Sequence, residues 1–220
     1  MQRIPEPELM LDPAQARAYA EADFAEPHEA FVARFRECFP DLAVSGQVLD
    51  LGCGPGDVAA RFARAFPACS VDGIDGSAAM LAEGERLLAL HGVADRVRLH
   101  RCLLPDDAPP NAPYDGIISN SLLHHLHEPA VLWRAIRDHA RAGAFVYVMD
   151  LMRPDSPEVA RALVERYSGD EPEVLRHDFY HSLLAAFSPD EVRAQLDDAG
   201  LHGLAVQPAS DRHLIVWGWL

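Results

Sequence analysis

The sequence predicts a doubly wound α/β fold, in which helices cover both faces of a mostly parallel sheet. Three observations predict it. Short apolar segments alternate with segments of helical period through residues 47–220. The short segments are apolar throughout, as in strands of a parallel sheet that are buried on both faces. A glycine-rich turn follows the first of them, where an open α/β sheet places its ligand crevice.

The predicted elements follow one another as strand, then helix. The strands are expected at residues 47–51, 69–74, 97–102, 114–119, 144–150, 204–206 and 213–219. The helices between them are expected at residues 57–66, 77–91 and 128–139, and a last one begins at Ser188. Asp57 is expected to cap the first of these helices, and Ser188 precedes Pro189, which is typical of a helix N-terminus.

Two helical segments lie outside this pattern and are expected to cap the sheet. Residues 1–46 predict two helices, at 14–24 and 28–39, separated near Pro27. They are interpreted either as a lid over the ligand or as helices packed on the sheet edge. Residues 151–187 form a helical insertion in the domain at 47–220.

The charge disfavours two classes of partner. The chain has 220 residues, with 19 Lys+Arg against 34 Asp+Glu, a formal charge of −15, and no lysine. Such a surface repels phosphate backbones and anionic lipids, so neither nucleic acid nor a membrane is expected as a partner. The N-terminus shows no signal peptide, and the four cysteines show no CxxC spacing, so a cytoplasmic protein with reduced thiols is expected.

The most informative motif is Gly52-Cys53-Gly54-Pro55-Gly56, which follows the first strand. Its spacing differs from the GxGxxG of dinucleotide sites, because Asp57 stands where the third glycine would be. Asp50 and Asp57 would repel a diphosphate and attract a ligand with an amino group and a sulfonium. The motif therefore favours S-adenosylmethionine over a nicotinamide dinucleotide.

Residues 48–57 resemble the glycine motif of class I S-adenosylmethionine-dependent methyltransferases, and the resemblance extends over nearly all of residues 47–220. It implies a Rossmann-like methyltransferase fold with seven strands, the last one antiparallel. It also implies that Asp75 binds the ribose hydroxyls and that residues 114–126 pass beside the reactive methyl group. The expected cofactor contacts are Asp50, Gly52, Cys53, Gly54, Asp75, Gly76, Met80, Leu103, Asn120 and Ser121.

The sequence departs from that family at the adenine position. Many members carry an acidic residue after the third strand, where this chain has Cys102-Leu103-Leu104. Adenine is therefore expected between apolar side chains, Met80 and Leu103, and backbone groups.

Three residues are candidates for the acceptor side. His124 and His125 follow the fourth strand and could serve as a general base, or could only cap and pack the loop. Tyr180 lies in the insertion and is a candidate contact to the reacting groups. His177 and His181 have the spacing of a metal pair, but no third ligand is evident nearby in the sequence, so no metal site is predicted.

The resemblance implies methyl transfer from S-adenosylmethionine to a small-molecule acceptor held under the two helical caps. Two other interpretations stay open. One is an S-adenosylmethionine-using enzyme of tRNA wobble-base modification, or a non-methylating user of the sulfonium. The other is a non-catalytic protein that binds an adenosyl ligand. A homodimer, the identity of the acceptor and the atom methylated are also left open.

Overall fold

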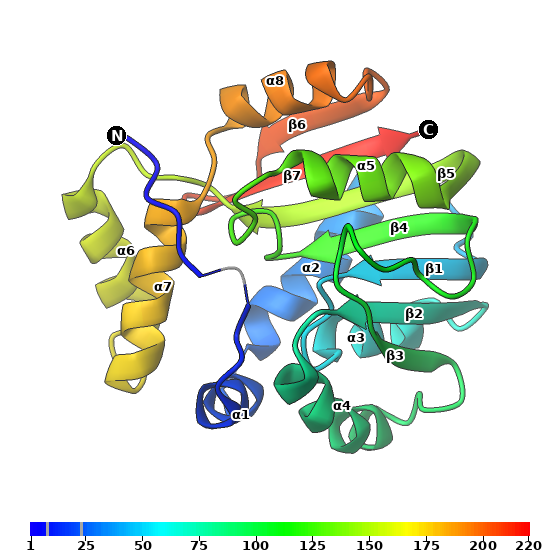
Figure 1. Ribbon diagram of the computed structural model, residues 1–220, viewed down its shortest axis with the longest axis horizontal. Helices are drawn as coiled ribbons and strands as arrows, with labels where there is room; N and C mark the ends of the chain where they lie inside the picture. The colour runs from blue at the N-terminus through cyan, green and yellow to red at the C-terminus, as the bar shows by residue number, and fades with distance from the viewer. Residues whose placement is uncertain (8, 23) are drawn as a thin grey trace.

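The computed structural model describes residues 1–7, 9–22 and 24–220, and one twisted sheet forms its centre (Figure 1). The described strands are β1 (Gly46–Leu51), β2 (Cys69–Asp75), β3 (Val97–Arg101), β4 (Tyr114–Asn120), β5 (Ala140–Leu151), β6 (Leu204–Pro208) and β7 (His213–Trp219). Their order in the sheet is β3-β2-β1-β4-β5-β7-β6. Only β7 runs antiparallel to its neighbours, β5 and β6. The predicted fold class is confirmed, including the antiparallel last strand.

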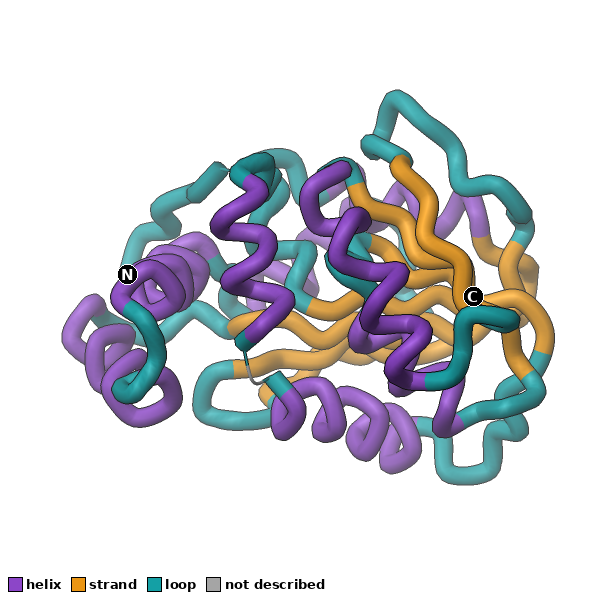
Figure 2. The backbone as a smooth tube through the Cα atoms, turned by 90° about the horizontal axis from the view of Figure 1, so that it is seen from below, coloured by secondary structure: helices purple, strands orange, loops and turns teal. Residues whose placement is uncertain are grey.

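Helices cover both faces of this sheet (Figure 2). The described helices are α1 (Pro13–Glu21), α2 (Ala25–Cys38), α3 (Asp57–Ala65), α4 (Ala78–His91), α5 (Ala130–His139), α6 (Pro157–Ser168), α7 (Glu173–Ala185) and α8 (Pro189–Asp198). On one face α2, α3 and α4 pack against side chains such as Val48 and Tyr147. On the other face α5 and α8 pack against Leu49 and Val146.

This double cover explains why the central strands are apolar without alternation. Successive side chains of a strand point to opposite faces, and here both faces meet a helix. Val146, Tyr147 and Val148 are successive residues of β5, and each is 0% exposed. Burying a large apolar side chain completely stabilises the fold by about 1.5–3 kcal/mol. The sheet is therefore a rigid platform for whatever lies at its carboxyl edge.

Three local predictions need correction. Strand β5 begins at Ala140, four residues before the predicted start. Helix α2 begins at Ala25, so Pro27 lies in its first turn, where the missing N–H costs nothing. Asp57 is the first residue of α3, and Gly56 takes the N-cap position with a φ of 83°. Ser188 does cap α8, since its hydroxyl accepts a hydrogen bond from the Glu191 amide.

The expected lid over residues 1–46 divides into two parts with different roles. Phe31 and Phe35 of α2 are 0% and 1% exposed within the core, so α2 is an ordinary packed helix. The segment before α1, residues 1–7 and 9–12, is called the N-terminal strap below. Its Ile4 amide donates to the Leu184 carbonyl of α7 at 3.0 Å. The strap, α1, α6 and α7 all lie beyond the carboxyl ends of the parallel strands (Figure 1).

Within the described parts of the chain, none of the helices combines the length and the apolar character that crossing a membrane requires.

Candidate cofactor and acceptor site

A cavity of about 1280 Å³ lies at the carboxyl ends of β1, β2 and β4. The glycine loop and the loop after β4 form one wall, and the strap, α1 and α7 form the other. Pockets for one small molecule measure roughly 300–1,000 Å³, so this cavity has room for two ligands side by side. The structure brings together around it all ten residues predicted to contact the cofactor: Asp50, Gly52, Cys53, Gly54, Asp75, Gly76, Met80, Leu103, Asn120 and Ser121.

The glycine loop turns sharply between β1 and α3. Gly54 has a φ of 53°, in the left-handed region that side chains rarely adopt. A Cβ atom at this position would stand 3.1 Å from the Met80 methyl carbon. The loop therefore brings bare backbone to the cavity wall, which allows a ligand to approach closely.

Asp75 ends β2 and is held by backbone donors. Its two carboxylate oxygens accept hydrogen bonds from the Ser77 amide at 2.7 Å and the Gly54 amide at 2.9 Å. Burial raises the pKa of Asp75, and these two N–H groups oppose that shift. Each oxygen keeps a further lone pair, so the carboxylate can still accept from the hydroxyls of a bound ligand.

Two buried acceptor oxygens at the cavity have no hydrogen-bond partner among the described residues. They are Asp50 Oδ2 on β1 and Asn120 Oδ1 at the end of the neighbouring β4. Burial, and then the charge of Asp75, raise the pKa of Asp50 well above its ordinary value. Leaving a buried acceptor unsatisfied costs about 1–3 kcal/mol. A ligand that brings positive charge and N–H donors would satisfy both atoms, and the amino and sulfonium groups of S-adenosylmethionine fit this requirement.

The loop after β4 places two histidines, His124 and His125, at the cavity. His124 is 3% exposed, and its Nδ1 lies 2.5 Å from Asp150 Oδ1. Burial opposes charging of His124, but the charge of Asp150 outweighs it and raises the pKa of the imidazole. Burial, and then the nearby His124, lower the pKa of His125 to about 3. The two neighbouring rings therefore have opposite tendencies to bind a proton.

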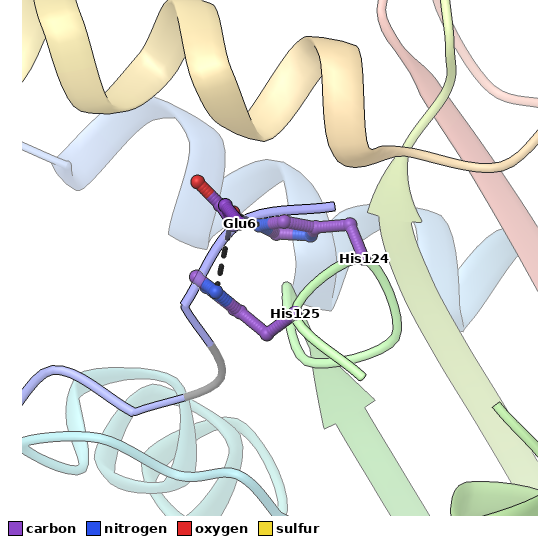
Figure 3. A group of neighbouring side chains, drawn as sticks. All are labelled: Glu6, His124 and His125. Atoms are coloured by element: carbon purple, nitrogen blue, oxygen red, sulfur yellow. Dashed lines mark ion pairs between the residues drawn. The ribbon is translucent and has the colours of Figure 1, made fainter. Parts of the chain in front are cut away.

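Glu6 joins these histidines from the strap, and sequence reasoning missed it (Figure 3). Its Oε1 lies 3.2 Å from His125 Nδ1 and 3.6 Å from His124 Nε2. The same oxygen accepts a hydrogen bond from the Ser182 hydroxyl of α7 at 3.0 Å. Burial raises the pKa of Glu6, and the charge of His124 opposes this shift. Pro5 and Pro7 predict an extended chain around Glu6, but nothing local indicates what it contacts.

Helix α7 presents one face to the cavity and another to α6. His177, Asp178 and His181 line the cavity, whereas Tyr180 packs toward Arg161 of α6, whose guanidinium lies 5.7 Å from the ring centre. Tyr180 is not among the described residues that line the cavity. A contact between Tyr180 and the reacting groups therefore stays a prediction.

A comparison with protein families agrees with this geometry. A family model described as a methyltransferase domain matches residues 49–146, the region from β1 to β5 that carries the glycine loop and Asp75. Residues 49–146 are thus similar to a methyltransferase domain. This similarity agrees with the family, and with the cofactor S-adenosylmethionine, that the sequence predicts.

Other relatives of the methyltransferase domain differ in what they act on. A trans-aconitate 2-methyltransferase of Methylobacterium nodulans is 33% identical over 137 residues, which cover 61% of this chain and 49% of that protein. A ribosomal RNA small subunit methyltransferase C of a Shewanella species is 41% identical over 83 residues, which cover 37% of this chain and 22% of that protein. The chain thus spans half or less of the length of these relatives.

A solved structure shares the fold across the whole domain. A SAM-dependent methyltransferase from Aquifex aeolicus superposes with a TM-score of 0.68 at 18% identity. The match covers 96% of this chain and 99% of that one. Because the match covers nearly the whole of both chains, the overall architecture of the chain is one that this fold adopts.

Proposed function

We propose that this protein transfers a methyl group from S-adenosylmethionine to a small-molecule acceptor enclosed between the loop after β4 and α7. The observation that carries the proposal is the size and lining of the cavity. It is lined by the ten predicted cofactor contacts and also by Glu6, His124, His125 and polar residues of α7. We assign the first group to the cofactor and the second to the acceptor, and we call the parts of the cavity that they line the cofactor end and the acceptor end. A volume of about 1280 Å³ accommodates a cofactor and a second, small molecule.

Different residues of the cofactor end are assigned to different parts of S-adenosylmethionine. Asp50 and Asn120 supply the unpartnered acceptors for the cationic methionine part. Asp75 supplies a carboxylate held in place by two amides for the ribose hydroxyls. Met80 and Leu103 line the cavity where an apolar face for adenine is needed. When bound, S-adenosylmethionine supplies an electrophilic methyl group, whose bond to sulfur breaks as its bond to the acceptor forms, while the acceptor loses a proton and the sulfur becomes a neutral thioether.

The strap contributes by alignment and by exclusion of water. Arg3 donates to the carbonyls of His124 and Leu126 at 2.9 Å each, so the strap is attached to the loop that follows β4. A displacement at carbon depends on holding nucleophile, methyl and leaving sulfur in line, which a closed cavity favours. The proposal therefore needs no acid–base residue, and a base role for His124 or His125 stays a prediction.

Charge supports a small acceptor over RNA. A formal charge of −15 without any lysine opposes a phosphate backbone, although one relative is named for ribosomal RNA. The acceptor end is also covered by the strap, so a nucleotide within a polymer would reach it only after the strap opened.

The test follows a labelled methyl group. The purified chain is incubated with methyl-labelled S-adenosylmethionine and panels of small carboxylates, phenols, amines and thiols, and separately with tRNA and ribosomal RNA. We expect label in a small molecule, with S-adenosylhomocysteine formed in equal amount. Label in RNA alone would contradict the acceptor class. Tight cofactor binding without transfer to a broad metabolite extract would favour the adenosyl-binding interpretation instead.

A further inference from the structure

Three potential metal ligands converge at the acceptor end of the cavity. Glu6, His124 and His125 each offer one ligand atom, and these atoms lie within 4.8 Å of one another. Glu6 comes from the strap and the histidines from the loop after β4, so they meet only through the fold (Figure 3). The carboxylate is 10% exposed and His124 is 3% exposed, so bulk water does not solvate the cluster freely.

The hydrogen bonds leave lone pairs directed into this cluster. His124 Nδ1 lies against Asp150 Oδ1. In the neutral tautomer whose Nδ1 donates to that carboxylate, Nε2 carries the lone pair on the side of Glu6. A carboxylate on the far nitrogen of a histidine is the usual support of a metal-binding imidazole. His125 Nδ1 is buried and has no hydrogen-bond partner among the described residues, although Glu6 Oε1 is 3.2 Å away.

The spacing of the donors matches that of metal ligands. A tetrahedral zinc ion holds nitrogen and oxygen ligands at roughly 2.0–2.1 Å, which places two ligand atoms about 3.4 Å apart. Glu6 Oε1 lies 3.2 Å from His125 Nδ1 and 3.6 Å from His124 Nε2. The 3.6 Å separation is long for a hydrogen bond and His125 Nδ1 makes none with the described residues, whereas both separations are close to those around a shared ion.

We propose that Glu6, His124 and His125 bind a divalent first-row transition-metal ion. Two imidazoles and one carboxylate suit zinc, iron, cobalt or nickel, whereas magnesium and calcium prefer oxygen ligands alone. Three protein ligands leave at least one coordination position open toward the cavity. A metal here also links the strap to the loop after β4, because Glu6 and the histidines belong to those two segments.

The open position indicates a class of acceptor. A carboxylate or hydroxyl oxygen of a small molecule would complete the coordination and be fixed at the acceptor end. This part rests on the proposed function, because it assumes that a methyl acceptor occupies that end. The metal site itself does not depend on it.

The experiment measures metal binding directly, without activity. The full-length chain is treated with a chelator, dialysed and titrated with zinc chloride by calorimetry, and with magnesium chloride in parallel. We expect one equivalent of zinc and no magnesium to bind. Glu6→Gln and His125→Gln should each weaken zinc binding at least tenfold. Glu6→Gln keeps an acceptor for the Ser182 hydroxyl, so the strap is expected to stay folded.

Two controls separate this site from other histidines. His202→Gln removes an exposed imidazole on the surface and should leave the zinc titration unchanged. A double variant, His177→Gln with His181→Gln, removes the helical pair on α7 and should also leave it unchanged. Absence of stoichiometric binding, equal affinity in Glu6→Gln, or loss only in the double variant would each overturn the proposal.

Failure of the metal site and failure of the proposed function are distinguishable in the same samples. S-adenosylhomocysteine is titrated into each variant, since its predicted contacts do not include Glu6 or the two histidines. If that ligand binds and zinc does not, the metal proposal is wrong and the proposed function stands. If zinc binds at this cluster and S-adenosylhomocysteine does not bind, the proposed function is wrong and the metal site stands.

Discussion

One carbon atom added at Gly54 would have two effects: it would strain the backbone, and it would change the wall of the cavity. The φ of 53° at Gly54 is costly for any residue with a Cβ, and that Cβ would meet Met80 at the cavity wall. Gly92 ends α4 with a φ of 66° and has open space around it. The two positions share the backbone cost, but of the two only Gly54 lines the cavity.

We predict that Gly54→Ala and Gly92→Ala each destabilise the fold by about 1 kcal/mol, because both force a side chain into the left-handed region. Only Gly54→Ala should also weaken binding of S-adenosylhomocysteine, by at least tenfold. Thermal unfolding and calorimetry of the two variants check this. Equal ligand affinity in both would show that the loop does not contact the cofactor.

Single residues also show how far the sequence could predict the site. The glycine loop and Asp75 were predictable because their function depends on local spacing at strand ends. That Tyr180 does not line the cavity could not be predicted, because the phase of α7 depends on which helix it packs against. Glu6 could not be found, since its partners His124 and His125 are far away in the sequence and only the folded strap brings them together.

Among the elements, the strap is the one whose position matters most for the acceptor end. Arg3 attaches it, donating to the carbonyls of Ala185, His124 and Leu126, with its guanidinium 4.0 Å from the centre of the Phe187 ring. Helix propensity cannot predict such an attachment, because it depends on carbonyl groups exposed at the ends of distant elements.

We predict that Arg3→Ala raises hydrogen exchange at the Ile4 amide, which pairs with α7, at least tenfold, equivalent to about 1.4 kcal/mol. Arg17→Ala is the matched control, because Arg17 makes only an exposed i,i+4 ion pair with Glu21. Exchange mass spectrometry of the N-terminal peptide measures both. Unchanged exchange in Arg3→Ala would mean that the strap is held by other contacts.

Three helices meet at Asp57, which couples α3 to α2 and α4. Its carboxylate lies 2.6 Å from His28 Nδ1, 2.6 Å from Arg61 Nε and 2.9 Å from His91 Nε2. Burial alone would raise the pKa of Asp57, but the hydrogen bonds from His28 and Arg61 outweigh it and hold that pKa well below its ordinary value. The folded state therefore gains stability from the ionised form.

Because the folded pKa is depressed, this stability is present above the unfolded pKa of about 3.9 and is lost as pH falls below it. We predict that Asp57→Asn costs about 2 kcal/mol at neutral pH and that the difference from wild type shrinks between pH ~5 and ~2. Asp190→Asn, at a 94% exposed carboxylate, should show little effect. Thermal unfolding across pH measures this, and a difference independent of pH would contradict it.

For the molecule as a whole, the sequence predicted the layers and two helical caps, but not the contacts by which the caps enclose the cavity. Buried strands and amphipathic helices are local patterns, so the sheet and its two covered faces followed from them. The closing of the cavity by the strap, α1 and α7 depends on contacts between segments from opposite ends of the chain, such as Gln15 with Asp178 at 2.8 Å. Such contacts leave no periodic trace in the sequence.

The central claim is that an adenosyl sulfonium compound binds at the carboxyl end of β1 and β2, with its sugar on Asp75. Calorimetric titration of S-adenosylhomocysteine, NADH and ATP tests this claim in wild type, Asp75→Ala and Asp106→Ala. Asp106 is the control, because it is an exposed carboxylate in the loop after β3. We predict binding of S-adenosylhomocysteine alone, weakened by about 1–2 kcal/mol in Asp75→Ala and unchanged in Asp106→Ala. Equal binding to wild type and Asp75→Ala, or no binding to either, would contradict the account.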